Sequence, residues 1–111
     1  MNFDTGYELI ITIVNKGWAD HVIKVTRNAG APGATVLHAR GSGIHDITSF
    51  LGLAIEPEKE IILNVVPESI SEKIVTEVAD ALNLKAPGTG ISMILPLRGV
   101  TGLFHDSDSR K

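Results

Sequence analysis

The sequence contains no cysteine, which excludes disulfide bonds and thiolate metal sites. Aromatic residues make up only 5% of the chain, so its core must be aliphatic and β-branched. The net charge is −3, which excludes the basic surface that DNA or RNA binding requires. No apolar run approaches the roughly 18 residues of a membrane-spanning helix. We therefore expect no nucleic-acid partner and no direct membrane insertion.

With 111 residues, of which 43% are hydrophobic, the chain is long enough for one domain with a substantial core. We predict a single domain over residues 1–111. Residues 1–6 lack the basic start and apolar run of a signal peptide. The expected location is therefore the cytoplasm.

The first half of the chain predicts a strand, a helix and a second strand. Residues 7–14 are rich in β-branched side chains and end at the turn signal of residues 15–17. Over residues 18–29 apolar side chains recur at helical spacing, and Gly30 follows where a helix C-cap belongs. Residues 34–40 form the next strand.

The second half repeats this order after a long connection over residues 42–58. Residues 60–66 predict a strand, and Ser69-Ile70-Ser71-Glu72 matches a capping box that would begin a helix reaching Leu84. Residues 91–97 form the last strand, and Pro96 favours a sheet edge. The connection lacks clear periodicity, which is typical of functional loops, and a polar tail covers residues 103–111.

The resulting order is β-α-β-β-α-β. With right-handed crossovers it predicts an α+β, ferredoxin-like fold, with an antiparallel sheet and both helices on one face. The strands are apolar on both sides, as in Ile10-Ile11 and Ile61-Ile62-Leu63. The uncovered sheet face is then too apolar for water, which predicts self-association.

Two glycine turns adjoin these strands, Gly41-Ser42-Gly43 and Pro87-Gly88-Thr89-Gly90. Glycine allows a close backbone approach and positive φ, so such turns often hold anions, although glycine is also the ordinary residue of tight turns. Arg40 and Arg98 could add positive charge to one anion.

The residues give no indication of an enzyme. Gly-x-Ser-x-Gly and the phosphate-binding lysine motif of P-loop ATPases are both absent. The pair His45-Asp46 is the most site-like of the histidine pairs, yet the spacing of the four histidines matches no metal signature. The charged residues between Glu56 and Glu60 are expected to form the solvated base of the long connection.

The order and motifs resemble the PII family of nitrogen-regulatory signalling proteins over residues 7–102. Residues 33–43 look like the family's strand leading into the T-loop, and Val65-Val66-Pro67-Glu68 looks like its third strand and helix start. Gly88-Thr89-Gly90 resembles the B-loop, and residues 98–102 resemble the basic strand and C-loop.

The resemblance implies a homotrimer that binds an adenine nucleotide (ATP, ADP, AMP or a cyclic nucleotide) in clefts between subunits. It also implies regulation of an enzyme, a transporter or a transcription factor through the long loop. Five residues carried over from the family would line the base and sugar, namely Thr35, Gly41, Ser42, Gly43 and Val65. Gly88, Thr89 and Gly90 would hold phosphates through backbone N–H groups, with Arg98 adding charge. A negatively charged side chain at Gly90 is then expected to abolish binding and leave the trimer intact.

The chain departs from the family at two points. Ile91 stands where the family places a phosphate-binding lysine, and of the basic strand only Arg98 remains. A ligand with less charge than ATP is therefore as plausible as ATP. The long loop has no tyrosine, which argues against uridylylation.

Two alternatives stay open at this point. One is a metal-binding trimer of the copper-tolerance type that uses histidines such as His45. The other is a structural interaction module that binds no nucleotide.

Overall fold

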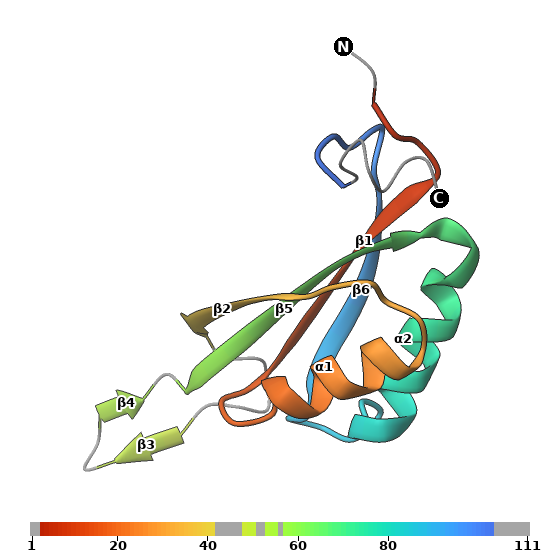
Figure 1. The fold of residues 1–111 in the computed structure, drawn as a ribbon. Helices are drawn as coiled ribbons and strands as arrows, with labels where there is room; N and C mark the ends of the chain where they lie inside the picture. The colour runs from red at the N-terminus through yellow and green to blue at the C-terminus, as the bar shows by residue number, and fades with distance from the viewer. Residues whose placement is uncertain (1–2, 42–47, 51–52, 56, 104–111) are drawn as a thin grey trace.

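The computed structural model describes residues 3–41, 48–50, 53–55 and 57–103 (Figure 1). Four antiparallel strands form the main sheet in the order β2-β5-β1-β6, and helices α1 and α2 cover one of its faces. The strands are β1 (Tyr7–Asn15), β2 (Thr35–Arg40), β5 (Glu58–Pro67) and β6 (Gly90–Pro96), and the helices are α1 (Ala19–Asn28) and α2 (Glu68–Leu82). The predicted α+β ferredoxin-like fold is confirmed.

The core lies between the sheet and the helices. Alternate residues of β1 and β5 point toward the helices, because successive side chains of a strand lie on opposite faces. Ile10, Ile62 and Val66 are fully buried there, packed with Val22 of α1 and with Ile74 and Val78 of α2. The core is aliphatic, as the low aromatic content predicts.

Helix α1 follows the predicted pattern. Val22 and Thr26 are buried, whereas Asp20, Lys24 and Arg27 are exposed. Gly30 comes directly after the C-cap residue with φ of +112°, a conformation that glycine adopts without steric cost.

The predicted capping box of α2 is wrong. The helix begins at Glu68, its N-cap is Pro67, and no side chain caps it. Strand β5 continues to Pro67, whose ψ of 139° is extended, so the helix can begin only after it. The Gly6 carbonyl accepts the Glu68 N–H at 2.9 Å, and the Ser71 hydroxyl of the first turn donates to Glu8 Oε1 at 2.5 Å. The helix also ends two residues earlier than predicted, at Leu82, and is followed by Asn83 in the left-handed conformation.

The other face of the sheet carries a layer of aliphatic side chains that no described element covers. Strand register places Leu9, Ile11 and Ile13 of β1 at its centre. On the outer strands the side chains of Leu37, Ile91, Met93 and Leu95 are 37–54% exposed. We call this surface the open face, defined by the residues Leu37, Leu9, Ile11, Ile13, Ile61, Leu63, Val65, Ile91, Met93 and Leu95.

The long connection contains two short strands that the sequence did not predict. Strands β3 (Thr48–Phe50) and β4 (Leu53–Ile55) pair antiparallel as a separate two-stranded sheet, which lies beyond the ends of β2 and β5 (Figure 1). Strand β6 is a sheet edge, as Pro96 predicts. The tail beyond Leu103 lies outside the described residues. Within the described part of the chain, no helix combines the length and hydropathy needed to cross a membrane.

Candidate functional site

The described residues of the predicted site fall at two ends of the sheet. Gly41 and the turn Gly88–Gly90 lie at the end where β1 finishes, since Gly90 pairs with Val14. Val65 and Arg98 lie toward the other end, since Val65 pairs with Leu9 and β6 ends opposite Glu8. Strand β6 spans roughly 20 Å at about 3.4 Å per residue, with Gly90 at its start and Arg98 two residues after its end. Ser42 and Gly43 are outside the described residues.

Asn15 and Lys59 hold the Gly88–Gly90 turn against the sheet. Asn15 Nδ2 donates to the Gly88 carbonyl at 2.9 Å, and Asn15 Oδ1 accepts from Lys59 Nζ at 2.6 Å. The Thr89 hydroxyl lies 3.0 Å from the carbonyls of Asn83 and Ala86, so this side chain is engaged with the end of α2. The hydrogen of this hydroxyl is therefore used within the fold, and the role of the Thr89 backbone N–H in phosphate binding stays a prediction.

Lys59 is a cation that the sequence-based site did not include. Its residue exposure is only 8%, and its strand position puts it on the same face as Ile61 and Leu63. The prediction that this charged segment is solvated is wrong for Lys59 and for Glu60, which is 9% exposed. The sequence signal for this burial was that Lys59 and Glu60 run directly into the apolar part of β5. Positive charge is thus present next to the Gly88 turn even though Ile91 replaces the family's lysine.

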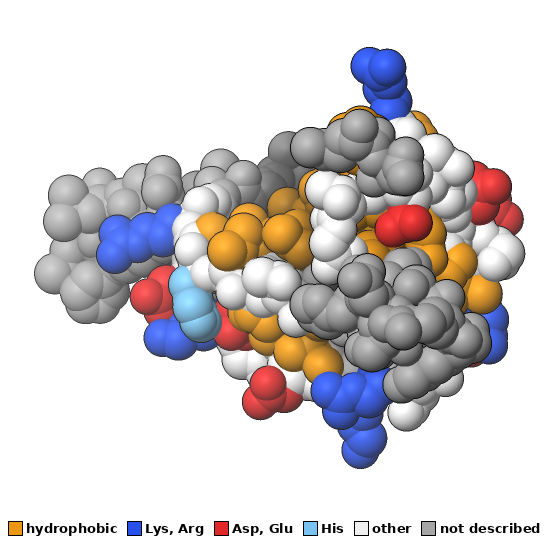
Figure 2. Space-filling model, turned by 45° about the horizontal axis from the view of Figure 1, so that its top comes forward, with side chains coloured by type: hydrophobic (Ala, Val, Ile, Leu, Met, Phe, Trp, Pro, Cys, Tyr) orange, Lys and Arg blue, Asp and Glu red, His pale blue; other side chains and the backbone are white. Residues whose placement is uncertain are grey.

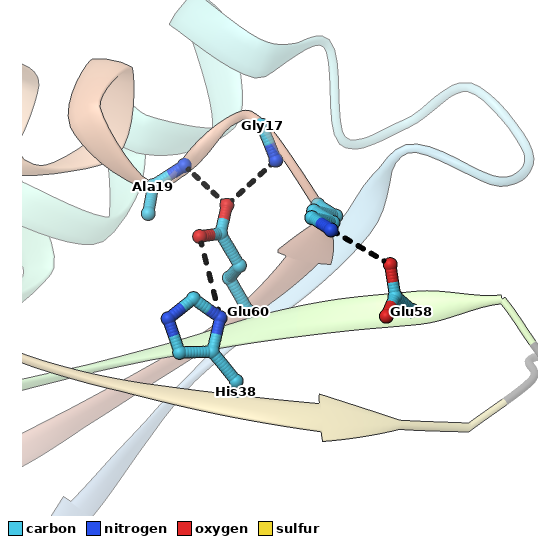
Figure 3. A network of polar contacts seen from close by, with 6 residues as sticks. Gly17, Ala19, His38, Glu58 and Glu60 are labelled. Carbon is cyan, nitrogen blue, oxygen red and sulfur yellow. Dashed lines mark hydrogen bonds and ion pairs between the residues drawn. The ribbon is translucent and has the colours of Figure 1, made fainter.

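Glu60 lies on the helix side of the same strand and closes the start of α1 (Figure 3). Its Oε1 accepts the N–H groups of Gly17 at 2.7 Å and Ala19 at 3.1 Å, and its Oε2 lies 3.8 Å from His38 Nδ1. Negative charge is favourable at a helix N-terminus, where backbone N–H groups lack partners within the helix. Glu60 therefore acts as a cap supplied from 41 residues away.

We expect Glu60→Ala to lower the free energy of unfolding by about 1–2 kcal/mol, because two N–H groups at the start of α1 lose their acceptor. Urea unfolding followed by circular dichroism measures this change. His38→Ala is the matched control, since a 3.8 Å contact of a side chain that is 75% exposed contributes little. Equal losses in the two variants would contradict the capping role of Glu60.

The two ends of the long connection lie next to each other. The Gly41 N–H donates to the Pro57 carbonyl at 3.3 Å, so the two ends of residues 42–56 are adjacent. Lys16 Nζ donates to Glu58 Oε2 at 2.9 Å beside them. This hydrogen bond lowers the pKa of Glu58 and raises the pKa of Lys16. Both side chains are exposed, so the pair orients this corner more than it stabilises the fold.

A cavity of about 650 Å³ opens on the open face near the start of β1. It forms where β2 begins, because the pairing of β2 with β5 starts at Thr35 and Leu63 while β5 continues to Pro67. Thr35, Leu63 and Val65 line it, together with Tyr7, Leu9, Gly30, Pro32, Gly33, Ala34, Pro67 and Leu103. Figure 2 shows hydrophobic side chains in the middle of one face of the molecule and charged side chains mostly toward its outline.

The cavity brings together two of the predicted residues, Thr35 and Val65. Among the described residues, none that lines the cavity is charged, and the hydroxyl groups of Tyr7 and Thr35 are the side-chain polar groups there. An apolar cavity with few polar groups is suited to a planar ring, and its volume falls within the roughly 300–1,000 Å³ of small-molecule sites. Arg98 is exposed and lies beyond the end of β6, just past the backbone contact of Leu97 with Tyr7.

Comparison with known proteins bears on these features. The family model described as nitrogen regulatory protein P-II matches residues 7–102. The chain belongs to the P-II family. A solved structure of CPII, a nitrogen regulatory PII-like protein from Thiomonas intermedia bound to ADP, AMP and bicarbonate, superposes with a TM-score of 0.60 at 16% identity. The match covers 79% of this chain and 86% of CPII. None of the curated proteins matches the chain significantly.

This P-II chain has no group of three or more potential metal ligands among its described residues. His45, which the metal-binding alternative requires, lies outside them, so that alternative is neither supported nor opposed at its own residue. The features that the structure does describe include an apolar cavity, the Gly88–Gly90 turn and a buried lysine.

Proposed function

We propose that the chain is a PII-like signalling protein that binds an adenine nucleotide between neighbouring copies of a homotrimer. The observation that carries this proposal is the uncharged cavity at Thr35 and Val65 in a P-II family member. ADP and AMP are the first candidates, because CPII is bound to both. The nucleotide state is passed to a partner protein through residues 42–58.

One copy of the chain brings together only part of the proposed site. Its cavity lies at one end of the sheet, and the Gly88–Gly90 turn lies at the other end. In the proposed arrangement the cavity of one copy, with Arg98 beside it, faces the Gly41 and Gly88 turns of the next copy. The open face supports this arrangement, since an aliphatic surface of this kind is stable in water only when it is covered.

The charges favour a nucleotide with one or two phosphates. Lys59 is linked to the Gly88 turn by Asn15, which hydrogen-bonds to both. Arg98 would come from the neighbouring copy. Ile91 supplies no charge where the family has a lysine. Two cations and backbone N–H groups match the charge of ADP or AMP better than that of a triphosphate.

Titration calorimetry with AMP, ADP and ATP tests the proposal. We expect the unmodified protein to bind ADP or AMP, and Thr35→Trp to weaken that binding at least tenfold, because the new ring fills the cavity from an exposed position. Thr76→Trp is the matched control, since Thr76 is an exposed residue of α2 outside the cavity. Absence of binding by the unmodified protein at millimolar concentrations, or equal loss in both variants, would rule out this site.

A further inference from the structure

Asn64 is a polar residue at a core position of β5, where the neighbouring core residues are aliphatic. Its exposure is 0%, and it lies between Ile62 and Val66, which belong to the core. Its Oδ1 has no hydrogen-bond partner among the described residues. A buried acceptor without a partner costs free energy, which any role of this amide has to offset.

The nitrogen of the same amide has a defined partner. Asn64 Nδ2 donates to the Gly33 carbonyl at 2.8 Å and lies 3.4 Å from Thr26 Oγ1. A carbonyl only accepts hydrogen bonds, so the nitrogen of the amide must face Gly33 and the orientation of the side chain is fixed. Asn64 thereby connects β5 to α1 and to the segment that joins α1 to β2.

That segment, residues 30–34, is one wall of the cavity. It is held at its start by backbone hydrogen bonds from Gly30 to Arg27 and from Ala31 to Thr26. It is held at its end by the pairing of Thr35 with Leu63. Between these points, the hydrogen bond from Asn64 fixes Gly33.

The neighbours of Asn64 in β5 form the floor of the same cavity. Leu63 and Val65 line it on the open face, while the Asn64 side chain leaves the strand on the opposite face, toward the helices. Residues 63–65 of β5 therefore have two roles. Leu63 and Val65 form the floor of the cavity, and Asn64 holds its wall by the hydrogen bond to Gly33.

We propose that Asn64 is a positioning residue for the nucleotide, which sets the distance between the Gly33 wall and the Leu63–Val65 floor without contacting the ligand. This inference rests on the proposed function for its ligand. It explains why the core keeps an amide with an unpaired oxygen. The amide lowers stability and keeps the cavity in one shape, which reduces the ordering that binding would otherwise require.

The test compares Asn64→Val with Thr26→Val. Valine suits a buried strand position beside Ile62, removes the unpaired oxygen and removes the bond to Gly33. We expect Asn64→Val to melt at the same temperature as the unmodified protein or higher, and to bind ADP about tenfold more weakly. Hydrogen exchange of residues 30–35 should become faster without ligand. Thr26→Val keeps the bond to Gly33, so its affinity for ADP should stay within about twofold.

Two results would overturn the inference. One is unchanged hydrogen exchange of residues 30–35 in Asn64→Val, and the other is an affinity for ADP that falls equally in both variants. Failure of the unmodified protein to bind ADP or AMP would instead contradict the proposed function. The exchange measurement needs no ligand, so it still decides whether Asn64 holds the wall.

Discussion

Replacing Gly90 with alanine is expected to lower the free energy of unfolding by about 2–4 kcal/mol, a shift of roughly 10 °C or more in melting temperature. Gly90 has φ of +142°, which residues with a side chain rarely adopt. A Cβ atom there would lie 2.5 Å from the Ile13 carbonyl oxygen and 3.2 Å from Val14 Cγ1. The strain falls on the pairing of β1 with β6, so it cannot relax without opening the sheet edge.

Gly41→Ala is the control for this prediction. A Cβ at Gly41 has nothing within 4 Å and its φ lies outside the left-handed region, so we expect stability to change by less than about 1 kcal/mol. Thermal unfolding of both variants measures the difference. Similar melting temperatures would show that the β1–β6 edge tolerates a side chain.

The close approach of Gly90 to β1 changes how variants of this residue are to be interpreted. From the sequence, a side chain at Gly90 is expected to remove ligand binding and leave the assembly intact. The 2.5 Å approach to Ile13 means that the fold itself requires glycine at this position. Loss of binding in a Gly90 variant would therefore say little about phosphate contacts, and Gly41→Ala is the better probe of a glycine turn.

The second large effect is expected from Ile11→Glu at the centre of the open face. Ile11 lies opposite Leu63 on β5 and Met93 on β6. A carboxylate there would have to be buried among aliphatic side chains if copies of the chain assemble on this face, at a cost of several kcal/mol per copy. We expect the proposed trimer to dissociate to monomers, as measured by light scattering after size exclusion.

Thr76→Glu is the matched control, because it adds the same charge to an exposed position of α2 on the other side of the molecule. It should leave the assembly unchanged. A trimer that survives Ile11→Glu would show that copies do not meet on the open face. Because Ile11 points away from the helices, a folded monomer with a normal helical signal separates dissociation from unfolding.

Features that depend on local spacing could be predicted from the sequence. The periodicity of α1, the position of Gly30 after it and the edge position of the strand containing Pro96 all depend on neighbours a few residues apart. The β-α-β-β-α-β order then leaves few possible topologies. The family match over residues 7–102 agrees with the resemblance inferred from short motifs.

Features that depend on distant contacts could not be predicted. Glu60 is buried because it accepts N–H groups from Gly17 and Ala19, 43 and 41 residues away. The Ser69–Glu72 pattern matches a capping box, yet the extended Pro67 moves the start of α2 to Glu68. Of the predicted site residues, Thr35 and Val65 line one cavity, and their role in binding stays a prediction. The burial of Lys59 and Asn64 could not be predicted, because only the fold reveals it.

The contact between Gly41 and Pro57 also bears on how far the length and sequence of the connection between them can vary. Because β2, β5 and the Glu58–Lys16 contact hold Gly41 and Pro57 next to each other, the connection between them starts and ends at the same point of the sheet. For a flexible insertion, doubling its length costs only about 0.6 kcal/mol in closure entropy. Loops of other lengths and sequences can therefore be exchanged at this point without altering the sheet and helices that carry them.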